Sequence, residues 1–64
     1  MNETEAIKKA QEILKKDNYR DLTIDDGKEL LMLEKYIDGD IFGSLIEAFY
    51  AAAPEDVANE FTQL

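Results

Sequence analysis

The sequence predicts an all-α fold, a compact single-domain bundle of about four short helices over residues 1–64. Apolar residues recur at spacings of three and four along most of the chain, and no segment alternates with period two as a strand would. A chain of 64 residues has room for one core only. Hydrophobic residues make up 45% of it, which is enough for the chain to collapse into a globule.

The first helix is expected over residues 4–17, where the apolar residues lie on one stripe. That stripe consists of Ala6, Ile7, Ala10, Ile13 and Leu14. Opposite charges stand four residues apart on the other face, as Glu5 and Lys9 do, which is typical of a solvated helix surface. Residues 18–23 then form a connection rich in turn-forming residues, with Leu22 packed under the core.

The second helix is expected over residues 24–38. Thr23 is its predicted N-cap, because its hydroxyl can accept from a free backbone amide, and Asp26 completes a variant of the capping box. The buried stripe consists of Leu30, Leu33 and Ile37. Gly39 is expected to end the helix in the left-handed conformation that glycine adopts readily.

The third helix is expected over residues 41–53, with Asp40 as its N-cap. Apolar residues cover more than half of its circumference, so we expect it to be central and mostly buried. They are Ile41, Phe42, Leu45, Ile46, Ala48, Phe49, Ala52 and Ala53. Pro54 suits a first helical position, so a fourth helix is expected over residues 54–63. Its predicted inward residues are Val57, Ala58, Phe61 and Leu64.

The composition argues against most kinds of catalytic and metal site. The chain has no Cys and no His, so disulfides, thiol nucleophiles and Cys/His zinc sites are excluded. An EF-hand loop beginning at Asp21 would have Asp26 where glycine is required and Met32 where a bidentate glutamate is required. We therefore expect no enzyme activity, no metal and no cofactor.

Neither a secretory signal nor a membrane span is predicted. The first ten residues contain no apolar run. The longest uncharged stretch, residues 48–54, is far shorter than a bilayer requires. We therefore expect a cytoplasmic protein that does not bind membranes.

The charge is acidic and unevenly distributed along the chain. Asp and Glu number 15 against 7 Lys and Arg, a net charge of −8. Residues 1–20 carry five basic and four acidic residues, a net of +1, whereas residues 21–64 carry two basic and eleven acidic residues, a net of −9. Carboxylates also stand four residues apart, as Glu34 and Asp38 do, which destabilises a helix slightly.

These carboxylates suggest an anionic surface that imitates a nucleic-acid backbone and occupies a basic groove on a nucleic-acid-binding protein. Small phage proteins that inhibit nucleic-acid enzymes, of the anti-CRISPR and anti-restriction classes, are the functional class that this charge and size suggest. Such a protein would not bind nucleic acid itself. The predicted partner-binding residues, with Leu31 as an apolar anchor among the carboxylates, are Asp25, Asp26, Glu29, Leu31, Glu34, Asp38, Glu47, Asp56 and Glu60.

The alternative is a helical interaction domain that acts through apolar contacts, as a homodimer or as an antitoxin or adaptor. In that case the carboxylates serve solubility and helix capping. Salt dependence separates the two hypotheses, because an electrostatic interface weakens as ionic strength rises and an apolar interface barely responds.

Overall fold

The structure, a computed structural model, describes residues 1–15 and 21–64. In this part of the chain there are four α-helices and one 3₁₀ turn, which confirms the all-α bundle. They are α1 (Glu3–Lys15), α2 (Ile24–Met32), the turn η2 (Glu34–Tyr36), α3 (Gly39–Ala52) and α4 (Glu55–Thr62). The expected end of the first helix at Asp17 and the connection over 18–20 lie outside the described residues.

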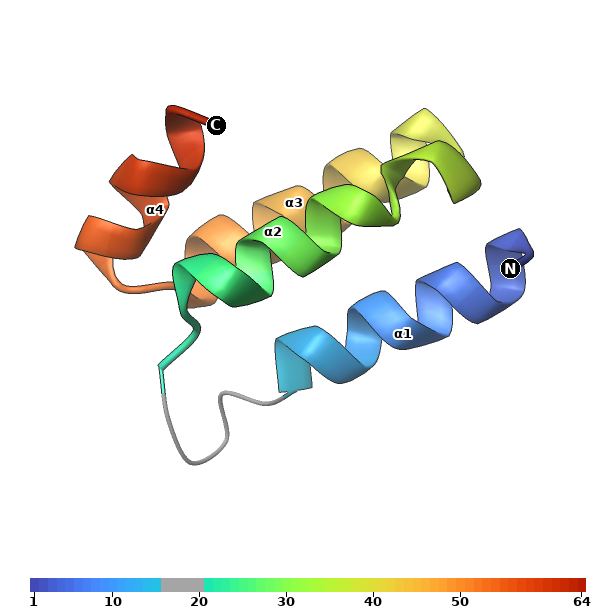
Figure 1. The fold of residues 1–64 in the computed structure, drawn as a ribbon, viewed down its shortest axis with the longest axis horizontal. Helices are drawn as coiled ribbons and strands as arrows, with labels where there is room; N and C mark the ends of the chain where they lie inside the picture. The colour runs from blue at the N-terminus through green and yellow to red at the C-terminus, as the bar shows by residue number, and fades with distance from the viewer. Residues whose placement is uncertain (16–20) are drawn as a thin grey trace.

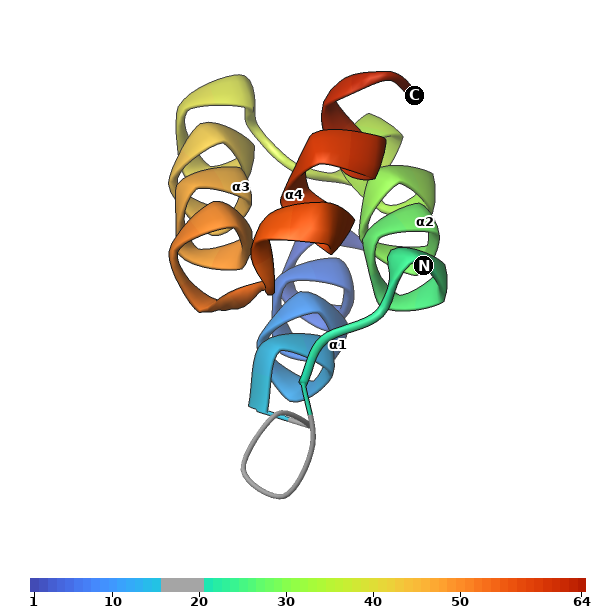
Figure 2. The same ribbon diagram turned by 90° about the vertical axis from the view of Figure 1, so that its left-hand side faces the viewer.

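Three helices run along the molecule and the fourth crosses one end. Helices α1 and α3 point in the same direction, and α2 runs antiparallel to both (Figure 1). Helix α1 contacts α2 and α3, while α4 packs on α2. Viewed from that end, α4 lies between α2 and α3, with α1 below them (Figure 2).

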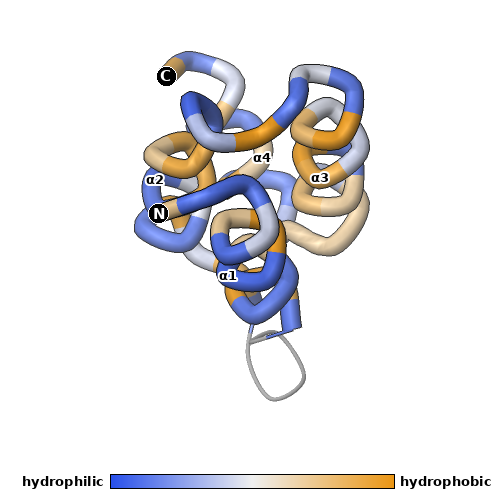
Figure 3. Tube along the Cα trace, turned by 90° about the vertical axis from the view of Figure 1, so that its right-hand side faces the viewer, coloured by the Kyte–Doolittle hydropathy of each residue, from blue (hydrophilic) through white to orange (hydrophobic). Residues whose placement is uncertain are grey.

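The core is built from residues of all four α-helices, of the segment before α2 and of the segment between α2 and α3. The buried hydrophobic residues are Ala6, Ala10, Ile13, Leu22, Leu30, Leu33, Ile37, Phe42, Phe49 and Phe61. Figure 3 shows hydrophobic turns of α1, α2 and α3 toward one another, with hydrophilic turns on the outside of α1. The predicted burial of Leu22 and of the stripe of Leu30, Leu33 and Ile37 is thereby confirmed.

Gly27 allows α4 to approach α2 closely. A Cβ at this position would lie 2.6 Å from Cδ2 of Phe61 and 3.0 Å from Cζ of Phe49. The rings of Phe49 and Phe61 are tilted against each other with centroids 4.7 Å apart, and Tyr50 stands edge-on to Phe61 at 5.4 Å. An aromatic cluster thus seals the end of the bundle where α4 crosses.

The second helix ends earlier than predicted. At Leu33 the backbone N–H is shared between the carbonyl oxygens of Leu30 and Leu31, so the helix tightens into η2. The chain then becomes extended at Ile37, with φ −121° and ψ 136°. The turn and the extended residue together place the side chain of Ile37 in the core. The predicted helix to residue 38 would have contained no extended residue.

The predicted caps between the second and third helices were wrong. No described glycine has a positive φ, and Gly39 is the first residue of α3 rather than a helix terminator. Asp38, not Asp40, is the N-cap, and its carboxylate accepts from the backbone N–H of Asp40 at 3.1 Å. The extended Ile37 makes the left-handed glycine unnecessary, because the chain has already left the helical path.

Helix α3 is far more exposed than predicted. Only Phe42 and Phe49 are buried, Leu45 and Ile46 are half-buried, and Ile41 is 40% exposed. A domain this small buries a limited share of its surface, and α3 lies at the edge of the bundle. Part of its apolar surface therefore remains in contact with solvent.

Helix α4 begins at Glu55, one residue later than predicted, with Pro54 as its N-cap. Phe61 is buried, and Val57 and Ala58 are half-buried, as the apolar stripe predicts. The inward placement of Leu64 was wrong, because its side chain is 59% exposed. It follows the last turn of α4, which ends at Thr62.

Candidate protein-binding surfaces

The predicted acidic residues come from every element after α1. Asp25 and Glu29 lie on α2, Glu34 on η2, and Glu47 on α3. Asp38, Asp56 and Glu60 lie at the start of α3 and on α4, and all of these seven side chains are exposed. The eighth acidic residue, Asp26, is buried.

Asp26 has a structural role and is not part of the surface. Asp26 is only 4% exposed. Its carboxylate accepts from the backbone N–H of Thr23 at 2.9 Å and from the Thr23 hydroxyl at 3.2 Å. The Asp26 backbone N–H donates to the Thr23 hydroxyl oxygen at 3.3 Å. This confirms the predicted capping box at the start of α2 and corrects the assignment of Asp26 to partner binding.

Asp38 also serves the fold, because it caps α3 and anchors α1. Its backbone N–H donates to Oε2 of Glu3 at 2.7 Å, while its carboxylate accepts from the Asp40 amide. Two carboxylates therefore meet the positive end of the α3 dipole, where negative charge is favourable. These contacts account for Asp38 without a role in partner binding.

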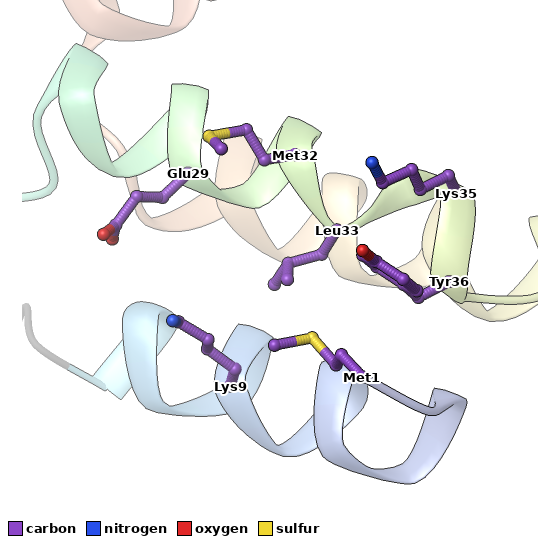
Figure 4. A pocket seen from close by; sticks show the side chains of 7 residues that line it. All are labelled: Met1, Lys9, Glu29, Met32, Leu33, Lys35 and Tyr36. Carbon is purple, nitrogen blue, oxygen red and sulfur yellow. The ribbon is translucent and has the colours of Figure 1, made fainter.

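Glu29 lies at one end of a groove between α1 and α2, near Lys9, and Lys35 lies toward the other end (Figure 4). The groove has a volume of about 250 Å³ and is lined by Met1, Lys9, Glu29, Met32, Leu33, Lys35 and Tyr36. The ammonium group of Lys35 stands 5.3 Å from the centre of the Tyr36 ring, within the range of a cation–π contact. Glu29 therefore belongs to a surface of mixed charge and not to a purely anionic one.

Leu31, the predicted apolar anchor, is not among the exposed large apolar side chains. It is half-buried and packs against the core. The exposed apolar side chains beside the groove are its neighbours in sequence, with Met32 71% exposed and Tyr36 exposed at the end of η2. Helical periodicity turns Leu31 toward α4, because it lies four residues after Gly27.

The anionic part of the molecule lies on α3 and α4. Residues 36–64 contain no Lys or Arg, and their acidic side chains, all exposed, are Asp38, Asp40, Glu47, Glu55, Asp56 and Glu60. The described lysines lie on the other two helices and η2: Lys8, Lys9, Lys15, Lys28 and Lys35. The molecule is therefore electrically polarised, with the cations among the α1 and α2 carboxylates and none on α3 or α4.

Sequence reasoning missed Asp40 and Glu55 as members of this surface, and it assigned Asp40 to a helix start alone. The missing signal was the absence of any basic residue after Lys35, which the amino-acid order shows directly. It also missed Met32 and Tyr36, whose exposure depends on how the chain turns at Leu33.

Over residues 1–15 and 21–64, no three acidic side chains are grouped so that they could hold a metal ion. None of the helices formed by these residues combines the length and apolar content that a membrane span requires. Comparisons with protein-family models, with curated proteins and with solved structures find no match to this chain.

Proposed function

We propose that this protein is a small binding module that places its α3–α4 side on a basic groove of a nucleic-acid-binding protein and so excludes the nucleic acid. The observation that supports this proposal is the set of exposed carboxylates on α3 and α4 in a segment without a single cation. A groove built for phosphates presents Lys and Arg side chains, which carboxylates on a rigid helical scaffold would attract. An inhibitor of the anti-CRISPR or anti-restriction class, acting without catalysis, is the kind of protein that this surface fits.

The carboxylate set differs from the sequence-based one. Asp26 is excluded by burial, and Glu29 by its place in a groove that Lys9 and Lys35 also line. Asp56 and Glu60, four residues apart on α4, are its centre, since no cation lies on their helix to neutralise them. Glu47 on α3 extends it.

The test is capture from an extract of the source cell, with the protein immobilised and Asp56→Lys/Glu60→Lys as the variant. We expect the wild-type protein to retain a nucleic-acid-binding protein that duplex DNA displaces. Raising the salt from about 50 mM to about 200 mM should lower the affinity about tenfold, because the Debye length shortens. The charge reversal should abolish retention.

The matched control is Glu12→Lys/Asp25→Lys. It changes the net charge equally and again replaces one first-turn and one last-turn carboxylate, but on α2 and α1. We expect this control to retain most of the affinity. Equal losses in both variants, or a partner that duplex DNA does not displace, contradict the proposal.

A second candidate is an adaptor that binds through apolar contacts in the groove between α1 and α2. The observation in its favour is the exposure of Met32 and Tyr36 beside Leu33, because methionines adapt to varied apolar partners. Retention that persists at high salt, with both charge-reversal variants behaving as wild type, would favour this candidate over the acidic surface.

A further inference from the structure

Helix α3 carries an apolar stripe that no described part of the chain covers. Ile41, Leu45, Ala48 and Ala52 follow at spacings of four, three and four, which is the heptad pattern of a helix that packs against another helix. Ile41 is 40% exposed, Ala48 and Ala52 are exposed, and Leu45 is half-buried. The pattern thus lacks a partner helix among residues 1–15 and 21–64.

The stripe lies on the flank of α3 nearer α1. On the opposite flank, the Tyr50 hydroxyl is 3.0 Å from Oγ1 of Thr62, which places that flank against α4. Helix α1 contacts α3, and the hydrogen bond from Asp38 N–H to Glu3 sets the start of α1 level with the start of α3. The two helices run in the same direction from there (Figure 1).

Helices α1 and α3 carry opposite charges at matched spacing. Lys8 and Lys15 stand seven residues apart on α1, and Asp40 and Glu47 stand seven residues apart on α3. Seven residues rise about 10.5 Å, so each pair forms one row along its helix. With Glu3 level with Asp38, Lys8 lies between the levels of Asp40 and Glu47, and Lys15 lies within a turn beyond Glu47.

We propose that a second copy of this chain covers the stripe, in a parallel dimer whose two-fold axis runs along the helices. Such an axis places the lysine row of each copy over the carboxylate row of the other. A two-fold axis across the helices would instead place lysines over lysines and carboxylates over carboxylates. Charge complementarity therefore selects the parallel arrangement.

The small side chains of the stripe allow the two α3 helices to approach closely. Ala48 and Ala52 lie at successive positions of the heptad pattern, and Ser44 and Ala51, the neighbours outside it, are also small. The two net charges of −8 oppose association, although about 0.15 M salt screens charges beyond about 8 Å. We therefore expect a weak dimer, formed at high protein concentration. This inference does not depend on the proposed partner of α3 and α4.

Sedimentation equilibrium in about 0.15 M salt, from about 10 μM to about 1 mM protein, tests the association. We expect the average mass to rise from 7.3 kDa toward twice that value. Ala48→Glu should remain monomeric, because the carboxylate enters the stripe. Asn59→Glu, a matched control that adds the same charge at an exposed position on α4, should still associate. A wild-type chain that stays monomeric throughout, or equal effects of both variants, overturns the proposal.

The charge rows and the orientation are tested separately. Lys15→Glu and Glu47→Lys should each weaken association, and the double variant should restore it. Because the chain has no cysteine, Ile41→Cys and Ala52→Cys report direction under oxidation. In the parallel dimer each variant cross-links to its own copy, since the two sulfurs face each other within disulfide range. Cross-linking only in a mixture of the two variants shows an antiparallel pair and overturns the arrangement. Circular dichroism of each variant verifies that the helices are intact.

Discussion

Glycines in the middle of helices have opposite roles in α2 and α3. Gly27 faces Phe61 and Phe49 at a distance that leaves no room for a methyl group, whereas no heavy atom lies within 4 Å of the position that a Cβ at Gly43 would take. Neither glycine has a positive φ. Only Gly27 is therefore required by packing. Gly43 lowers the stability of α3, and no close contact requires a glycine there.

We expect Gly43→Ala to raise the free energy of unfolding by about 0.5–1 kcal/mol, because alanine loses less backbone entropy in a helix. Gly27→Ala should lower it by about 1–3 kcal/mol, because the methyl group forces the aromatic rings apart. Urea unfolding followed by circular dichroism measures both. A stabilising Gly27→Ala would show that α4 does not pack on α2 as described.

At the scale of elements, the start of α2 was easier to predict than its end. The capping box at the start of α2 joins Thr23 to Asp26, which are only three residues apart. Both partners are therefore visible in the sequence. The end of α2 depends instead on Ile37 reaching the core, which is a tertiary contact. The exposure of α3 was unpredictable for the same reason, since periodicity shows which residues are apolar but not how many helices surround them.

The capping box should contribute measurably to α2. Replacing Thr23 with alanine removes the hydroxyl that accepts from the Asp26 amide, and we expect a loss of about 1 kcal/mol in the free energy of unfolding. Thr4→Ala in α1, an exposed position, should change it by less than about 0.5 kcal/mol. The comparison is made by thermal unfolding of the two variants. Equal losses at the two positions would mean that the cap adds nothing.

At the scale of the whole molecule, the core is continuous from α1 to α4. The all-α class and the core of α1 and α2 followed from apolar spacing alone. The candidate surface did not, because the side on which a carboxylate lies depends on how the helices are placed. Asp26 shows this most clearly: its sequence context fits a surface carboxylate and a helix cap equally well, and only the fold buries it.

A single core implies that damage at one end unfolds the whole chain. Phe61 packs on Phe49 and over Gly27, so Phe61→Ala should cost about 3–5 kcal/mol, against a total of roughly 3–10 kcal/mol for a domain of this length. We expect loss of helix signal across the chain at 37 °C, and not in α4 alone. Leu64→Ala, on an exposed side chain beyond α4, is the control and should leave the signal intact. A selective loss of α4 would show that it is a separate folding unit.

Every lysine of the chain precedes Tyr36, and this has a practical consequence. Reagents that acylate primary amines can modify α1, α2 and η2 but find no target on α3 or α4. Coupling the protein to a solid support through its amines therefore orients it, with the two cation-free helices turned toward the medium. Biotin or dye attached in this way labels the molecule without touching a carboxylate of α3 or α4.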